Sequence, residues 1–239
     1  MYLKDITTIF FDLDGTLRYS TPRWVDFCAE VAVMLGAPDS AENRRRAERW
    51  SLEYFSTQSE LDARSYKGDW EAFWHAYYTR YARALGCGAE QAAQIAPQLY
   101  QIVEESYKRE DCVPDDVYDT LEALRSAGYR IGIITNRVGP LKQYLTELGL
   151  ETYLDFYFAA GEVGYSKPHP AIFRHALAVA KAAPAQSLFV GDNWYADILG
   201  ALKIGMAAVL VDPHRLFPEA ACPCIQSIGE LQQLLLPRV

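Results

Sequence analysis

An apolar stretch that ends in two carboxylates constrains this sequence more than any other feature. Residues 6–11 (Ile-Thr-Thr-Ile-Phe-Phe) carry only apolar and β-branched side chains, which predicts a buried β-strand. Asp12 and Asp14 follow at once, and side chains two residues apart in a strand point to the same face. Gly15 comes next, where it lets the backbone turn sharply and leaves room for a ligand beside the main chain. The stretch therefore predicts a strand that presents two carboxylates to a pocket.

The spacing of these carboxylates indicates a cation between them. Asp12 and Asp14 would repel each other by roughly 4 kcal/mol at 4 Å and an effective dielectric constant near 20. A hard divalent cation would remove that repulsion. Calcium loops also contain Asp-x-Asp-Gly, but they continue with further oxygen ligands and a distal glutamate. Here Thr16, Leu17 and Arg18 follow, so a catalytic metal site is favoured over a calcium loop or a simple turn.

The composition is that of a folded globular protein with an acidic balance. Half of the 239 residues are hydrophobic, enough for the core of one large domain or two modest ones. The net charge of −8 argues against a general binder of nucleic acid or anionic membranes. No apolar stretch reaches the roughly 18 residues of a membrane span, and the N-terminus lacks a signal-peptide pattern. We therefore expect a cytoplasmic protein without nucleic-acid or membrane partners, as either a monomer or a homodimer.

The cysteines predict free thiols. Five of them occur, an odd number, and most lie far apart, which suits a reducing compartment. Cys222 and Cys224 are the one close pair, and no second cysteine or histidine pair accompanies them at metal-ligand spacing. We expect this pair in a surface loop rather than in a metal or redox site.

Residues 24–109 show helical patterns only. Ser20-Thr21-Pro22 predicts a helix start, with a threonine cap and a proline in the first turn. An aromatic stripe then recurs at helical spacing, formed by Trp70, Phe73, Trp74, Tyr77, Tyr78 and Tyr81. We interpret this stripe as the packing core of a small helical unit, with a substrate-contacting surface as the alternative.

From residue 115 onward, helices and strands alternate. The predicted helices are 115–127, 141–148, 170–182 and 197–202, and the predicted strands are 129–135, 156–159, 187–190 and 207–211. This alternation predicts an α/β fold, a Rossmann-like parallel sheet with helices on both faces. The first strand must join that sheet to bury its apolar faces. We thus expect a discontinuous core of residues 1–17 and 110–239, interrupted by an all-helical domain of residues 18–109.

Polar residues follow several of the predicted strands. In an open α/β sheet, ligands bind at the carboxyl ends of the strands. The residues at or near those ends are Asp12, Asp14, Thr135, Asn136, Asp192, Asn193 and Asp197, and Lys167 precedes the helix that begins at Pro170. Carboxylates, a hydroxyl and a lysine at one edge suit phosphoryl transfer, in which a cation and a lysine neutralise phosphate oxygens.

Four ordered motifs carry a resemblance to a known family. Asp12-Leu13-Asp14-Gly15-Thr16, Thr135-Asn136, Lys167-Pro168 and Gly191-Asp192 with Asp197 resemble the motifs of the haloacid dehalogenase-like hydrolase superfamily. The chain is most similar to the phosphoglycolate-phosphatase-like branch, in which a helical cap domain is inserted directly after the first motif.

The resemblance implies roles for the first aspartates and the metal site. Asp12 would be the nucleophile that forms an aspartyl-phosphate, and Asp14 would protonate the leaving group and then activate water. Mg²⁺ would be held by Asp12, the main-chain carbonyl of Asp14, and Asp192. Asp197 would orient the water shell of the metal or Lys167, with Asn193 beside it.

The resemblance also implies a phosphate-binding set. Thr135 and the amide of Asn136 would bind the phosphoryl oxygens, and Lys167 would steady the nucleophile and the developing charge. The expected function is a magnesium-dependent phosphatase acting on a small phosphorylated metabolite. A phosphomutase of the same superfamily is the alternative, and a non-catalytic phospholigand-binding protein is a third hypothesis. Halide displacement is disfavoured, because dehalogenases of the superfamily lack an aspartate at the position of Asp14.

Overall fold

The protein forms two compact units. The computed structural model describes residue 3 and residues 5–236. One unit comprises the segments up to Tyr19 and from Cys112 onward, and the other comprises Ser20–Asp111. Among the described helices, none is long and apolar enough to cross a membrane.

A parallel sheet forms the centre of the first unit. Its strands are β1 (Thr8–Phe11), β4 (Arg130–Thr135), β5 (Phe156–Ala159), β6 (Ser187–Gly191), β7 (Ala207–Val211) and β8 (Cys224–Ile225). They are ordered β5-β4-β1-β6-β7-β8, and each neighbouring pair is parallel. This arrangement confirms the predicted Rossmann-like α/β fold.

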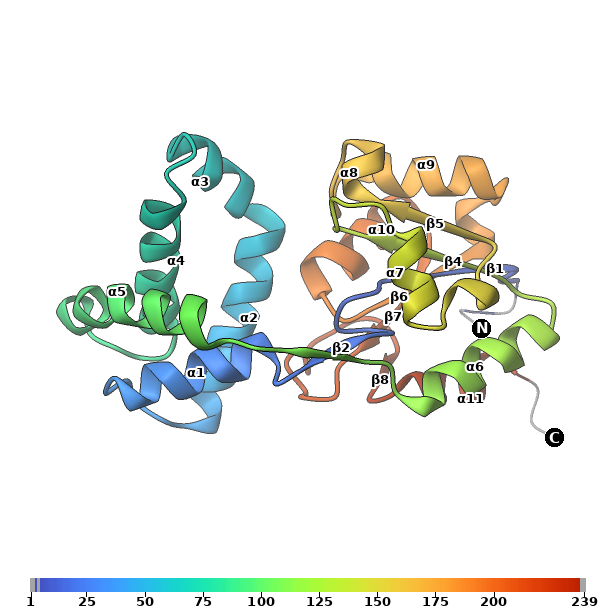
Figure 1. The fold of residues 1–239 in the computed structure, drawn as a ribbon. Coiled ribbons are helices and arrows are strands. Elements are labelled where there is room, and N and C mark those ends of the chain that lie inside the picture. The colour runs from blue at the N-terminus through green and yellow to red at the C-terminus, as the bar shows by residue number, and fades with distance from the viewer. Residues whose placement is uncertain (1–2, 4, 237–239) are drawn as a thin grey trace. The chain divides into compact units, whose positions relative to one another are not determined.

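Helices cover both faces of this sheet (Figure 1). Along β1, Ile9 and Phe11 pack into one core cluster and Phe10 into another, because successive side chains of a strand point to opposite faces. The first cluster includes buried residues of α6 (Asp115–Ser126), α7 (Lys142–Glu147) and α11 (Leu231–Leu235). The second includes residues of α8 (Ala160–Val163), α9 (Pro170–Ala180) and α10 (Leu199–Lys203). Burial on both faces explains the uninterrupted apolar run in the sequence.

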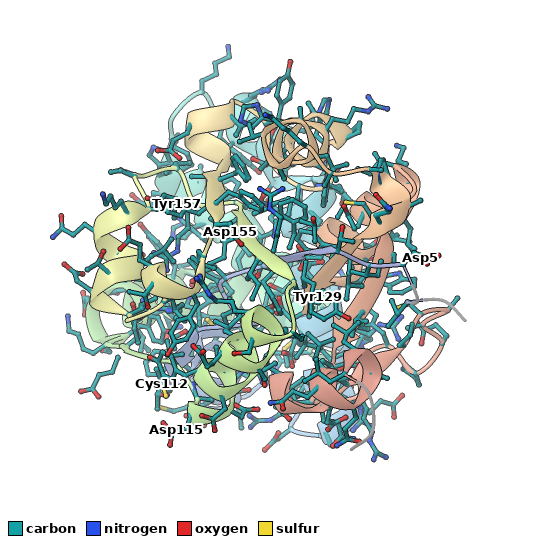
Figure 2. All side chains as sticks on the ribbon, turned by 90° about the vertical axis from the view of Figure 1, so that its right-hand side faces the viewer. Asp5, Cys112, Asp115, Tyr129, Asp155 and Tyr157 are labelled. Carbon is teal, nitrogen blue, oxygen red and sulfur yellow. The ribbon has the colours of Figure 1, made fainter. Side chains whose placement is uncertain are left out.

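Open α/β sheets bind ligands where the strand order reverses, and in this sheet that point lies beside β1. The chain passes from β1 to β4 and β5 on one side, then returns to β6 on the other side, so the order reverses at β1. Figure 2 looks onto the edge where strands begin, with Tyr129 and Asp155, the residues directly before β4 and β5, labelled. The opposite edge, where β1, β4 and β6 end, carries the candidate site.

The second unit is helical apart from its ends. It contains α1 (Trp24–Met34), α2 (Ala41–Thr57), α3 (Ser59–Ser65), α4 (Trp70–Ala84) and α5 (Ala89–Ser106). Four members of the aromatic stripe are buried in its core, namely Phe73, Tyr77, Tyr78 and Tyr81, while Trp70 remains 59% exposed. The interpretation of the stripe as packing core is thus confirmed for its central residues.

Three local predictions were wrong. No helix begins at residues 20–22: Tyr19–Thr21 forms β2, which pairs with β3 (Glu110–Cys112), because a residue before proline favours the extended region. Residues 194–198 form a π-helical turn, η3, ahead of α10, where we expected a helix from 197 to 202. For the cysteine pair the loop prediction is wrong for Cys224 alone: Cys222 lies in a loop, whereas the exposed Cys224 begins strand β8, whose main chain pairs with β7.

The described residues of the first unit also form three short 3₁₀ turns. They are η1 (Glu151–Tyr153), η2 (Pro184–Gln186) and η4 (Ile228–Glu230). The remaining predicted elements lie within two residues of the observed bounds, which is the usual uncertainty at element ends.

Candidate active site

A buried lysine links two aspartates at the carboxyl edge of the sheet. Asp12 directly follows β1, Lys167 lies in the loop before α9, and Asp197 lies in η3. The Nζ of Lys167 donates to Oδ1 of Asp12 over 2.5 Å and to Oδ1 of Asp197 over 2.7 Å. The side chain of Lys167 is only 2% exposed. Its charge is therefore balanced inside the protein by carboxylates rather than by water.

Burial and the neighbouring charges together set the pKa values in this cluster. Burial raises the pKa of Asp12 to about 7, although the nearby Lys167 acts in the opposite direction. Burial also lowers the pKa of Lys167, but Asp12 and Asp197 more than offset it, so that this pKa is raised overall. The lysine thus stays protonated, as a fixed positive charge beside Asp12.

A third carboxylate completes an acidic group. Asp192 follows β6, and carboxylate oxygens of Asp12, Asp192 and Asp197 all lie within 4.8 Å of one another. Burial, together with the charge of Asp12, raises the pKa of Asp192 well above its usual range. Grouped oxygen donors that repel one another suit a hard cation such as Mg²⁺. The residues present therefore fit a divalent metal ion.

The turn after β1 depends on Gly15. Its φ is +91°, a conformation that side-chain-bearing residues rarely adopt, and a Cβ at this position would lie 2.4 Å from Oδ2 of Asp192. The hydroxyl of Thr16 donates to Oδ1 of Asp192 over 3.3 Å. The turn thus brings the main chain directly against the Asp192 carboxylate.

Thr135 and Asn136 end β4 next to the lysine loop. The side-chain amide of Asn136 donates to the carbonyl of Lys167 over 3.0 Å and accepts from the amide of Lys167 over 2.7 Å. This pair of bonds attaches the Lys167 backbone to the end of β4. Thr135 is buried, and its Oγ1 accepts from the amide of Arg137 over 3.3 Å.

Asn193 shapes the π-helical turn. Its Oδ1 accepts from the amides of Tyr195 and Ala196, both over 3.0 Å, and its own amide donates to Oδ2 of Asp197 over 3.0 Å. Both carboxylate oxygens of Asp197 are thereby used, one by Lys167 and one by Asn193. π-helical turns often occur at functional sites, and this one carries Asp197 toward Lys167.

The Asp14 carboxylate binds two arginines, Arg18 and Arg137, of which Arg137 was not predicted as a site residue. Arg137 donates from Nε to Oδ2 and from Nη2 to Oδ1 of Asp14, both over 2.7 Å, and Nη1 of Arg18 donates to Oδ1 over 2.9 Å. The only signal in the sequence was the position of Arg137, directly after Thr135 and Asn136. The sequence does not indicate that Arg137 binds Asp14, because the two residues are 123 positions apart.

Comparisons with known proteins identify the family of this chain. Residues 6–205 match the family model described as haloacid dehalogenase-like hydrolase. The chain belongs to the haloacid dehalogenase-like hydrolase family. Haloacid dehalogenase-like hydrolase domain-containing protein 3 of Homo sapiens is 35% identical over 147 residues, covering 62% of this chain and 56% of that protein. Against this relative and two others, the chain spans about half of the relative's length.

Two further relatives extend the comparison. A phosphoserine phosphatase of Thermus thermophilus is 31% identical over 185 residues, covering 70% of this chain and 73% of that protein. A solved hydrolase of the family from Bacillus subtilis matches with a TM-score of 0.58 at 19% identity, covering 98% of this chain and all of that chain. The latter supports the shared fold.

Proposed function

We propose that this protein is a magnesium-dependent phosphomonoester hydrolase that acts on a small phosphorylated metabolite through an aspartyl-phosphate. One observation carries the proposal: a buried Lys167 bonded to Asp12 and Asp197, beside Asp192 at the carboxyl edge of a parallel sheet. Carboxylate nucleophile, fixed cation and metal-binding oxygens are the parts that phosphoryl transfer needs. The phosphoserine phosphatase among the relatives is consistent with this chemistry.

In the first step, an oxygen of Asp12 attacks the phosphorus atom of the substrate. The new bond joins Asp12 to phosphorus, while the bond from phosphorus to the leaving oxygen breaks. Asp14 delivers its proton to that oxygen, so that an alcohol leaves rather than an alkoxide. Lys167, Thr135 and the main-chain amide of Asn136 stabilise the charge on the phosphoryl oxygens.

In the second step, water attacks the phosphorus atom of the aspartyl-phosphate. Asp14, now a carboxylate, takes a proton from the water as the new bond forms. The bond between phosphorus and Asp12 breaks, which releases inorganic phosphate and restores the nucleophile. Because Asp14 gives one proton and receives one, the cycle closes without a further reagent.

Asp12, Asp192 and the main-chain carbonyl of Asp14 would hold the Mg²⁺. Asp197 is geometrically close, but both of its oxygens already accept hydrogen bonds, from Lys167 and Asn193, which favours a positioning role. When bound, the ion would screen the repulsion between the nucleophile and the phosphate and polarise the phosphoryl oxygens.

The helical unit supplies the proposed cap domain. The sequence-based boundaries of residues 18–109 lie within two residues of the compact unit Ser20–Asp111. Inserted domains of this kind are common carriers of substrate specificity, because the catalytic groups all lie in the other unit. We assign substrate selection to this unit.

The test is phosphate release from a panel of alkyl and sugar phosphates with Mg²⁺. We expect turnover of at least one compound, loss of more than a thousandfold in Asp12→Asn, and loss upon chelation by EDTA. Asp5→Asn, an exposed position of the same unit, serves as the matched control. No release from any compound, or undiminished release by Asp12→Asn, would refute the proposal.

Product analysis separates the hydrolase from a phosphomutase. A mutase would convert a sugar phosphate into its isomer with little free phosphate, whereas the hydrolase yields stoichiometric phosphate. A non-catalytic protein would bind phosphorylated compounds and release no product of either kind.

A further inference from the structure

Asp14 is held on both of its oxygens by one guanidinium. Nε and Nη2 of Arg137 reach Oδ2 and Oδ1, each over 2.7 Å. A planar guanidinium that donates two parallel bonds fixes the plane of a carboxylate, which a single ammonium does not do. The orientation of the Asp14 carboxyl group is therefore set by Arg137.

Arg137 is itself held in place by its surroundings. Its guanidinium carbon lies 3.9 Å from the ring centroid of Tyr144, and Nη2 donates to the Tyr144 hydroxyl over 2.9 Å. The carbonyl of Arg137 accepts from the amide of Gly161 over 3.2 Å. A Cβ at Gly161 would lie 2.0 Å from the carbonyl oxygen of Val138, so glycine permits this close approach of the two segments. Both the backbone and the side chain of Arg137 are thus located by contacts.

Stability alone gives a weak reason for this arrangement. The side chains of Arg137 and Asp14 are 27% and 37% exposed, and ion pairs open to solvent typically contribute about 0–1 kcal/mol. Direct binding of a substrate anion is also disfavoured, because the guanidinium already donates to both oxygens of Asp14. The remaining role is control of where the Asp14 carboxyl group points.

The hydrogen bonds distinguish the two oxygens of Asp14. Within the described part of the chain, Oδ1 accepts from Arg137 and from Arg18, whereas Oδ2 accepts only from Nε of Arg137. A carboxylate offers about two acceptor positions on each oxygen. Oδ2 therefore keeps one acceptor position, and Oδ1 keeps none.

We propose that Arg137, stacked on Tyr144, is a positioning residue that fixes the orientation of the Asp14 carboxyl group. The inference rests on the proposed function, in which Asp14 gives a proton to the leaving oxygen and later takes one from water. Without Arg137, the bond from Nη1 of Arg18 to Oδ1 would remain, but a single bond to one oxygen does not fix the plane of the carboxyl group.

The experiment compares leaving groups in the full-length protein. An alkyl phosphate needs protonation of its leaving oxygen, whereas p-nitrophenolate leaves readily without a proton. We would measure the rate of the first turnover for both substrates in wild type, Arg137→Met and Arg137→Lys. General acid catalysis contributes about 10²–10⁴-fold. We expect the alkyl phosphate to slow by about a hundredfold or more in both variants, with little change in KM.

Release of p-nitrophenol in the first turnover should change by less than about fivefold in the same variants. Arg125→Met, an exposed arginine of the same unit that donates to the carbonyl of Thr152, is the matched control and should leave both rates unchanged. Equal slowing of both substrates would assign Arg137 a structural role and overturn the inference, as would no slowing of either.

Chemical rescue provides a second, independent measurement. In Arg137→Ala, millimolar guanidinium ion should restore part of the alkyl phosphate turnover, and methylammonium should not, because only the former bridges two oxygens. Tyr144→Leu removes the support of Arg137 and leaves the arginine in place. Its turnover rate should depend on the leaving group in the same way as in the Arg137 variants, but more weakly. If wild type releases no phosphate, the proposed function fails. If wild type is active and the leaving-group dependence is unchanged in the variants, only the positioning role fails.

Discussion

The ammonium group of Lys167 donates to Asp12 over 2.5 Å, a contact between residues 155 positions apart in the chain. Because Lys167 also donates to Asp197, removal of the lysine would leave two buried carboxylates without a cation. Loss of one partner from a buried pair costs about 3–5 kcal/mol. We expect Lys167→Met to lower the free energy of unfolding by that order near pH 8, in urea titrations without metal. Lys142→Met, at an exposed position of α7, should change it by no more than about 0.5 kcal/mol, and equal effects would contradict the assignment.

The metal-free protein should gain stability as the pH falls from about 8 to 5. The folded-state pKa of Asp12 is raised from 3.8 to about 7, so between these values the folded protein binds a proton that the unfolded chain does not. Stability is then highest near the unfolded pKa and decreases as the pH rises through 7. At 1.36 kcal/mol per pKa unit, the shift corresponds to about 4 kcal/mol. Thermal unfolding in EDTA at pH 5.5 and 7.5 should show roughly half of it, about 2 kcal/mol, and Asp12→Asn should remove this contribution.

Added Mg²⁺ should offset the loss of stability at higher pH. An ion that binds only the folded protein stabilises it according to its concentration relative to its dissociation constant. We expect millimolar Mg²⁺ to raise the melting temperature at pH 7.5 more than at pH 5.5, where protons compete for Asp12 and Asp192. An increase that is the same at both pH values would argue against a carboxylate site.

Gly15→Ala should impair metal binding beyond its effect on the backbone. The alanine Cβ would meet Asp192 Oδ2 at 2.4 Å, while φ is +91°. Gly128→Ala is a matched control, because φ there is +89° and nothing lies within 4 Å of its Cβ. Both variants incur the left-handed strain of about 1–2 kcal/mol, but only Gly15→Ala displaces the carboxylate. Isothermal titration with Mg²⁺ should show weaker binding in Gly15→Ala alone.

Asp192→Asn should raise the Mg²⁺ concentration needed for half-maximal phosphate release by more than about tenfold. The substitution removes one charged oxygen from the group formed with Asp12 and Asp197. Activity at saturating Mg²⁺ should recover in part, because Asp12, Asp14 and Lys167 remain. A Mg²⁺ requirement equal to that of wild type would exclude Asp192 as a ligand.

Local pattern was sufficient for the fold class and for most of the candidate site. Alternating helices and strands after residue 115 predict a parallel sheet, and residues at the ends of its strands must share one edge. Asp12, Thr135 and Asp192 could therefore be selected without coordinates. Short-range signals failed where pairing between distant segments decides the structure, as for β2 and β3 around Pro22.

Apolar periodicity predicts the strands, and parallel strands bring the polar residues at their carboxyl ends to one edge of the sheet, which is why Asp12, Thr135 and Asp192 could be grouped from the sequence. The hydrogen bonds and ion pairs of the site are visible in the folded protein alone. In the folded protein, Lys167 is hydrogen-bonded to Asp12 and Asp197, and Arg137 is hydrogen-bonded to Asp14. Such bonds depend on side-chain directions and on separations of a few ångströms. The bonded residues are more than a hundred positions apart for Lys167–Asp12 and Arg137–Asp14, and thirty positions apart for Lys167–Asp197. No spacing along a chain encodes that geometry.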